Sequence, residues 1–582
     1  MLFLLPLGMV LTAASDPNPA AAADSVTAAC HDYWEGTLRA SPTWATSLGD
    51  RRYDHLLDDP TPAGRERERE RLEHLVARAR SLDPQGLAAG DRVNRSALLE
   101  VIENDLASMS CDFPSWTVDP MGGPQTSLFN LPSIQPVKTP EHGLAMVERW
   151  RAMGPYVDAH IANLRDGLAA GRVATHDQVR RVIEQLDELL ARPIEEWTLL
   201  DPLAEKHEDW SAAERETFAT QLRAAVAEGV RPALARYRDF LQTEVLPRAR
   251  PQEKVGLAHL PGGTDCYRKM IHVHTSLDLT PEEIHQIGLD EVARIRREMS
   301  ALGAKELGTG DLPEILRRLR TDKSLYFSTR EEVEAKAREA LARSQAAVPD
   351  WFGIQPVVPC EVVPMEAHEE KHSTIAYYRQ PAADGSRPGR YYINTYAPET
   401  RPRYEAEALA FHEAVPGHHL QIAIAQELKS LPDFRRHTGV TAYVEGWALY
   451  TEQLAEEMGL YSSDLDRMGK LSFEAWRACR LVVDTGMHAL GWSRQQAIDY
   501  MLANTALAEN NIVNEVDRYI TWPGQALAYK LGQLEILKLR QEARQRLGDR
   551  FDLRLFHDCV LRNGAVGLGT LRELVEECAP GS

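Results

Sequence analysis

The chain has 582 residues, with 66 lysines and arginines against 86 aspartates and glutamates, so its formal net charge is −20. Hydrophobic residues make up 43% and charged residues 26%, which are the proportions of a globular protein and exclude a disordered, collagen-like or multi-span membrane chain. The acidic charge also argues against nucleic-acid binding, because neutralising phosphates requires a basic surface.

The N-terminus resembles part of an export signal. Residues 2–13 are apolar and are followed by PAAAAD at 19–24, but the basic start of a signal peptide is missing. We therefore expect residues 1–24 to be a signal-like or disordered segment, and the protein to be either exported or cytoplasmic. No apolar run reaches the roughly 18 residues of a membrane helix, so no integral membrane segment is expected. Seven scattered cysteines without a C-x-x-C pair predict no disulfide framework.

Residues 25–254 are predicted to form a helical N-terminal region. Apolar residues recur three and four positions apart with charged residues between them, which is the period of amphipathic helices. Residues 111–132 interrupt this period with proline, glycine and aromatic residues. This segment is either a loop ordered by packing or a surface lid.

A boundary is expected near residue 255, so that residues 255–582 form the catalytic region. After a Pro-Gly-Gly turn, Thr280 and Glu283 form a predicted capping box with Pro281 at the first helical position. Residues 354–398 are rich in β-branched and aromatic residues and predict a small sheet. The helical period then returns, so the fold class is mainly α with one small β-sheet.

Two segments could bind a metal ion. The literal H-E-x-x-H pattern at 368–372 has charged residues between its histidines and strand-like sequence after it, so it is interpreted as a charged loop. The second segment, HEAVPGHHLQ at 412–421, lies within apolar helical sequence and contains three histidines and Glu413. Burying so many polar groups is costly unless they have a role.

The spacing in the second segment leaves its second histidine ligand open. His412 is the first candidate ligand, and Pro416 must interrupt the helix that carries it. In a regular helix His419 would return to the face of His412, whereas a two-residue bulge would bring His418 there. We favour His418 and keep His419 as the alternative.

A catalytic zinc ion usually has three protein ligands and one position open to water. Glu445, in TAYVEGWALYTEQ, follows at a distance that allows a second helix to pack beside the first, and it is the predicted third ligand. Glu452 lies on the same face of that helix and is a candidate for a supporting contact to a ligand.

These motifs resemble the bacterial family classed as domain of unknown function 885. The resemblance rests on five segments that cover most of residues 255–582: GRYYINTYAPETRP (389–402), HEAVPGHHLQ (412–421), AYVEGWALYTE (442–452), RLVVDTGMHALGWSRQQA (480–497) and EVDRYITWPGQALAYKLG (515–532). The family is in turn similar to gluzincin-type zinc metallopeptidases. That similarity implies a helical fold, a zinc cofactor and a small sheet next to the metal-binding helix.

The resemblance also implies roles for further residues. A strand at 391–396, with Tyr392 and Asn394, would hold the main chain of the substrate at a sheet edge, or would be a plain structural strand. Tyr529 would stabilise the oxyanion and Arg518 would bind a substrate carboxylate. Asp484 and His488 stand four apart and could pair on a helix. The H-x-H of His272 and His274 on a possible strand lacks an evident third ligand.

The sequence therefore predicts a zinc-dependent hydrolase that cleaves amide bonds of short peptides or small molecules in a helical cleft. Glu413 would be the base and Tyr529 the second catalytic residue. One alternative is a metal-dependent hydrolase of a non-peptide metabolite. Another, from a different class, is a catalytically inactive helical binding or scaffold protein. Oligomeric state and the choice between endo and exo cleavage are not readable from the sequence.

Overall fold

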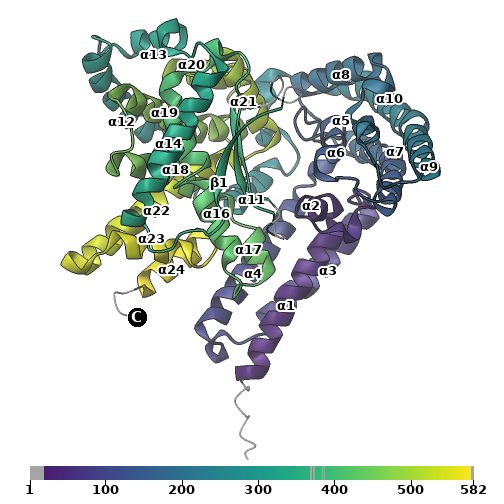
Figure 1. The fold of residues 1–582 in the computed structure, drawn as a ribbon, viewed down its shortest axis with the longest axis horizontal. Helices are drawn as coiled ribbons and strands as arrows, with labels where there is room; N and C mark the ends of the chain where they lie inside the picture. The colour runs from purple at the N-terminus through teal and green to yellow at the C-terminus, as the bar shows by residue number, and fades with distance from the viewer. Residues whose placement is uncertain (1–18, 367–369, 371–373, 383–384, 386, 579–582) are drawn as a thin grey trace, which may run out of the picture.

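The computed structural model describes residues 19–366, 370, 374–382, 385 and 387–578. In these residues the protein is mainly α-helical with one small sheet, as the sequence predicts (Figure 1). The helices of the N-terminal part are α1 (Pro19–Ala40), α2 (Pro42–Ser47), α3 (Pro62–Arg80), α4 (Ala89–Ser110), α5 (Pro124–Ser127), α6 (Leu131–Ile134), α7 (Pro140–Ala169), α8 (His176–Ala191), α9 (Ala212–Ala224) and α10 (Arg231–Phe240).

The remaining elements include the sheet and the helices that carry the candidate site. The helices are α11 (Gly263–Thr275), α12 (Pro281–Glu306), α13 (Leu312–Thr321), α14 (Arg330–Trp351), α15 (Ala406–Glu413), α16 (His418–Glu427), α17 (Asp433–His437), α18 (Thr441–Glu457), α19 (Asp464–His488), α20 (Arg494–Asn504), α21 (Glu509–Thr521), α22 (Ala528–Leu547), α23 (Leu553–Leu561) and α24 (Leu568–Glu577). The strands are β1 (Cys360–Pro364), β2 (Ala376–Arg379) and β3 (Gly389–Ile393).

Side-chain caps fix the starts of several helices. The predicted capping box at the start of α12 is confirmed: Thr280 accepts from the backbone N–H of Glu283, and the Glu283 side chain accepts from the N–H of Thr280. Ser211 and Ser493 begin α9 and α20 in the same way. Each box satisfies N–H groups that a helix start leaves without an intrahelical partner.

The three strands form a sheet in the order β1-β3-β2. β3 lies in the centre, with β1 parallel to it on one side and β2 antiparallel on the other. Tyr392 of β3 is the register partner of Val363 on β1 and of Tyr377 on β2. The predicted sheet at 354–398 is therefore confirmed, and its central strand is the last one before α15.

Separate apolar clusters hold the helices together. α7–α10 surround one cluster built from residues 118–245, and in Figure 1 these helices lie on one side of the molecule. Another cluster joins α1, α3 and α4 to the sheet and to the helices of the C-terminal part. α12, α13 and α19–α21 enclose a further cluster, and in Figure 1 α12, α13, α19 and α20 lie on the side opposite α7–α10. The boundary near residue 255 stays a prediction.

Residues 111–132 are ordered by packing, the first of the two interpretations of this segment. Trp116, Val118, Leu128 and Leu131 are buried, and Asp119 accepts a hydrogen bond of 2.8 Å from the indole of Trp522, just after α21. Two disulfides, Cys111–Cys266 and Cys559–Cys578, were not predicted from the cysteine spacing. Among the described residues, no helix has both the length and the apolar character needed to cross a membrane.

Candidate metal centre

The segment that carries the histidines is two helices separated by a turn. α15 ends at Glu413, the Val415–Pro416 peptide bond is cis, and α16 begins at His418. Gly417 lies so close to α15 that a Cβ atom built on it would be 1.9 Å from the carbonyl oxygen of His412. A side chain at this position would therefore displace α16. His412 and His418 are two positions further apart than the histidines of an H-E-x-x-H motif, and this turn accommodates the two additional residues.

This turn brings His412 and His418 together with Glu445 of α18. One ligand atom from each of the three lies within 4.8 Å of the others. His412 Nε2 is 3.7 Å and His418 Nε2 3.4 Å from Glu445 Oε2, and the two imidazole rings are nearly perpendicular. The histidines are buried and the carboxylate of Glu445 is largely so.

Glu452 fixes the ring of His412. Its Oε1 lies 2.8 Å from His412 Nδ1, which leaves Nε2 directed at Glu445. Burial lowers the pKa of His412, but the carboxylates of Glu445 and Glu452 outweigh it and raise that pKa to about 9. The cluster therefore favours a cation, and the supporting role predicted for Glu452 agrees with this geometry.

His419 faces the sheet and lies outside the cluster. Its Nδ1 is 3.0 Å from the hydroxyl of Tyr378, and its Nε2 is 3.0 Å from the carbonyl oxygen of Val358. Both ring nitrogens thus have protein partners. Burial lowers the pKa of His419 to about 4, so the ring is neutral at physiological pH. Of the two histidines left open by the sequence, the structure brings His418 to Glu445.

A close contact between α18 and α22 positions Glu445 relative to Tyr529. Gly446 and Gly532 face one another, and a Cβ on Gly446 would be 2.5 Å from the Cα of Gly532. Because neither residue has a side chain, the two helices approach closely. Tyr529 at the start of α22 is buried, and both burial and the carboxylate of Glu445 raise its pKa, so the phenol keeps its proton at neutral pH.

Glu413 follows His412 at the end of α15 and is partly exposed. Its carboxylate is close enough to Tyr391 of β3 to contribute to the raised pKa of that phenol, after the larger effect of burial. The predicted base therefore follows a candidate ligand in sequence and interacts electrostatically with the sheet. Arg518 lies on α21, where its Nη2 donates to Gln525 at 3.3 Å, and its positive charge acts on Tyr529.

The structure contradicts the prediction that residues 391–396 form an edge strand that binds substrate. β3 is paired on both sides, so its backbone has no free edge for an extended peptide. The ring of Tyr392 stacks on Tyr377 at 4.8 Å. The side chain of Asn394 donates to the carbonyls of Glu370 and Thr374 and accepts from the N–H of Tyr396. Tyr392 and Asn394 hold the sheet together, which was not visible without the order of the strands.

Three other sequence interpretations have different outcomes. His272 and His274 lie on helix α11, not on a strand, and their Nδ1 atoms contact Asp278 and Thr441. Asp484 and His488 do not pair: Asp484 accepts from Tyr267 at 2.6 Å, while His488 contacts the backbone of Leu257 and Tyr519. The H-E-x-x-H residues His368, Glu369 and His372 lie outside the described residues.

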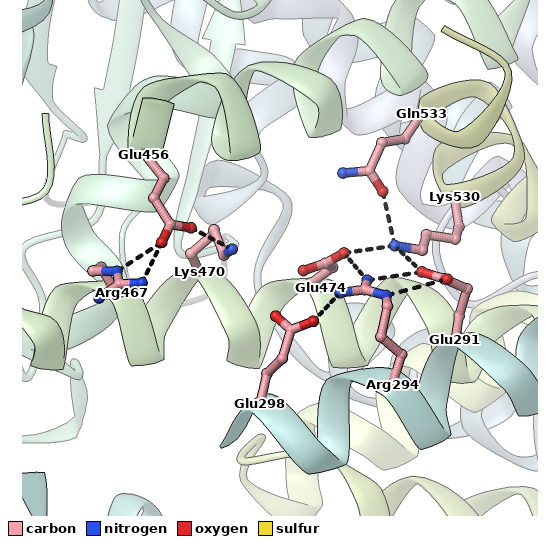
Figure 2. Close-up of polar contacts among 9 residues, drawn as sticks. All are labelled: Glu291, Arg294, Glu298, Glu456, Arg467, Lys470, Glu474, Lys530 and Gln533. Atoms are coloured by element: carbon pink, nitrogen blue, oxygen red, sulfur yellow. Dashed lines mark hydrogen bonds and ion pairs between the residues drawn. The ribbon is translucent and has the colours of Figure 1, made fainter. Parts of the chain in front are cut away.

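A buried ionic cluster that no sequence motif indicates holds the start of α22, where Lys530 follows Tyr529. Lys530 lies 2.8 Å from carboxylate oxygens of Glu474 and Glu291 and from Gln533, and Arg294 pairs with both glutamates (Figure 2). Burial raises the pKa of Glu474, but Lys530 and Arg294 outweigh it and lower that pKa to about 2. Its members come from α12, α19 and α22, so no local spacing could have shown them.

The fold and the site define a helical protein with a buried His-His-Glu cluster that can hold a metal ion. The chain belongs to the family described as "Bacterial protein of unknown function (DUF885)", whose sequence pattern matches residues 42–575. This confirms the family that the motifs resemble. None of the curated proteins compared with the chain matches it.

Two solved structures are similar over nearly the whole chain. One, a "putative lipoprotein" from Colwellia psychrerythraea, is 29% identical with a TM-score of 0.88, over 96% of this chain and 98% of that one. Another, a "putative lipoprotein of unknown function" from Shewanella oneidensis, is 20% identical with a TM-score of 0.75, over 96% of this chain and 100% of that one. A "putative oligoendopeptidase F" from Bacillus anthracis str. Ames aligns with a TM-score of 0.29 at 13% identity over 88% of this chain and 93% of that one, which is too low to support an argument.

Proposed function

We propose that the protein is a zinc-dependent hydrolase that cleaves amide bonds of peptides. The observation that carries the proposal is the cluster of His412, His418 and Glu445. Two ligands bound to one tetrahedral zinc ion at 2.0–2.1 Å lie about 3.3 Å apart. The observed separations of 3.4 and 3.7 Å between the histidine Nε2 atoms and Glu445 Oε2 are close to this value.

The polar atoms of the cluster also fit a metal ion. Glu445 Oε2 is buried and, among the described residues, has no hydrogen-bond partner of good geometry. A buried carboxylate oxygen in this state is costly unless a cation compensates it. Imidazole nitrogens and a carboxylate oxygen are common ligands of zinc. The contact between His412 and Glu452 is typical of zinc sites, where a carboxylate orients the ring of a ligating histidine.

The surrounding residues supply the remaining groups for amide hydrolysis. When bound, a zinc ion polarises a carbonyl group and lowers the pKa of water to about 7. Glu413 accepts the proton of the attacking water and passes it to the leaving amine. Tyr529, protonated at neutral pH, donates a hydrogen bond to the developing oxyanion.

Elemental analysis of the full-length protein, combined with hydrolysis of a mixed peptide library, tests the proposal. We expect about one zinc ion per chain in the wild type, its loss in His412→Ala, and cleavage that EDTA abolishes. Glu413→Gln should keep the metal and lose about 10²- to 10⁴-fold in kcat, because it removes the base. Glu456→Gln on α18, which pairs with Arg467 and Lys470 outside the cluster, is the matched control.

Two results would refute the proposed zinc dependence or the proposed peptide substrate. A protein that takes up no zinc after reconstitution is not a zinc hydrolase of any kind. A protein that holds zinc but leaves every peptide and dipeptide uncut is better explained by a non-peptide amide substrate.

We further propose that the protein acts in an exported compartment. The protein has two disulfides, Cys111–Cys266 and Cys559–Cys578, and disulfides are typical of oxidising environments. The two solved structures that cover nearly the whole chain are both described as a "putative lipoprotein". Alkylation of the protein unfolded without a reductant, followed by mass spectrometry, should leave these four cysteines unmodified and modify Cys30, Cys360 and Cys479. Alkylation of the four disulfide cysteines in protein from the native host would contradict export.

A further inference from the structure

Two arginines, one on α19 and one on α21, act on Tyr529. The Cζ atom of Arg480 is 4.3 Å from the ring centroid of Tyr529 and 4.4 Å from that of Trp476. Its side chain is 2% exposed, whereas that of Arg518 is 15% exposed. The charges of both arginines act on the phenol of Tyr529, as does the carboxylate of Glu445. Tyr529 therefore contacts Arg480 directly and interacts electrostatically with both Glu445 and Arg518.

The two arginines share a single carboxylate. Glu515 lies 3.0 Å from Arg480 Nη2 and 3.6 Å from Arg518 Nη1. Asp484 is the other carboxyl group that acts on both arginines, but it already accepts hydrogen bonds from Tyr267 and Gly524. Burial raises the pKa of Asp484 to about 7, so its charge is incomplete at neutral pH. The pair of arginines thus carries an excess of positive charge.

Each of these two arginines has one guanidinium nitrogen without an acceptor among the described residues. Arg480 Nη1 and Arg518 Nε are buried without a hydrogen-bond partner in the part of the chain that the structure describes. Leaving buried charged donors unsatisfied is costly, so such groups in a native protein are explained by a ligand, an ion or water that accepts from them. Planar guanidinium groups match a carboxylate best, because each can donate two parallel hydrogen bonds.

We propose that Arg480 and Arg518 bind the free α-carboxylate of a peptide substrate, so that the protein removes residues from the C-terminal end of peptides. This inference rests on the proposed function. In a peptide the terminal carboxylate and the nitrogen of the last amide bond are attached to the same Cα atom, and consecutive Cα atoms are only about 3.8 Å apart. The carboxylate must therefore bind beside the group that acts on that amide, and Arg480 contacts the ring of Tyr529. The negative charge of the carboxylate complements the excess positive charge of the two arginines.

Matched peptides that differ only at the C-terminus test the proposal. The full-length zinc protein should cleave a peptide with a free carboxylate roughly 10- to 100-fold more efficiently, in kcat/KM, than the same peptide as its C-terminal amide. Arg518→Gln should bring this ratio close to one, mainly by raising KM for the free acid. The control is Arg540→Gln: Arg540 is 14% exposed and pairs with Glu457 of α18, so it matches Arg518 in burial and should leave the ratio unchanged.

Binding measurements separate this inference from the proposed function. Full-length Glu413→Gln protein, which lacks the base, should bind the free-acid peptide more tightly than the amide in isothermal titration, and Arg518→Gln should abolish that difference. Cleavage of both peptides at equal rates by the wild type would overturn the carboxylate site and leave the hydrolase intact. If no peptide is cleaved, the proposed function fails, and the titration alone decides whether the arginines bind a carboxylate.

Discussion

Removing the charge of Glu452 should weaken zinc binding without removing a ligand. Glu452 Oε1 lies 2.8 Å from His412 Nδ1, and its side chain is 1% exposed, so solvent does not screen the contact. Outer contacts of this kind change metal affinity by about 10- to 100-fold, which corresponds to about 1.4–2.7 kcal/mol. Glu452→Gln keeps an acceptor for the ring N–H and loses the charge, so we expect about 10-fold weaker binding. Glu452→Ala loses both, and we expect about 100-fold.

Competition with a chromophoric chelator measures the zinc Kd of each variant. Glu456→Gln, on the same helix but paired with Arg467 and Lys470, should keep the wild-type Kd. The reasoning is refuted if Glu452→Ala binds zinc as tightly as the wild type. It is also refuted if Glu452→Gln and Glu452→Ala lose the same amount of zinc affinity and Glu456→Gln loses affinity too. The second outcome would mean that the substitutions act through the stability of α18.

Three further predictions concern ligand choice, packing and pH. His418→Ala should lower zinc affinity by more than the 100-fold limit of an outer contact, whereas His419→Ala should keep the metal, which chelator competition checks. Gly446→Ala should lower the free energy of unfolding by about 1–3 kcal/mol in urea titrations, because its Cβ overlaps Gly532, while Gly569→Ala in α24, with open space around it, should not. Burial raises the pKa of Glu405 from 4.5 to about 7, so its contribution to stability is present below pH 4.5 and is lost as pH rises through 7. Glu405→Gln, which still accepts from Ser472, should flatten that loss in unfolding curves at pH 5 and 7.5, and an unchanged pH dependence would contradict the assignment.

Local signals in the sequence predicted the elements and part of the site. The capping box at Thr280 and the β-branched run before α15 depend on neighbours in sequence, and both are confirmed. Pairing His412 with Glu445 required only that two apolar helices pack together. These features can be predicted from the sequence because the interactions that produce them involve residues close together in the chain.

Features set by contacts between distant segments were missed. The central place of β3 depends on which strands flank it, so the prediction of an edge strand at 391–396 was wrong. The disulfide Cys111–Cys266 joins residues 155 apart in sequence, so the spacing of the cysteines did not indicate it. Arg480 lay in a quoted motif, but its contact with Tyr529 required α19 and α22 to be placed side by side.

The turn between α15 and α16 affects how such sites can be found in other sequences. A search for two histidines one helical turn apart would stop at the charged segment 368–372 and pass over His412 and His418. The glycine before His418 is the more telling residue, because any side chain there would collide with the carbonyl of His412. A histidine-glutamate pair, then three residues, then glycine and histidine, with a glutamate on a later apolar helix, is therefore a spacing worth searching for in uncharacterised helical proteins.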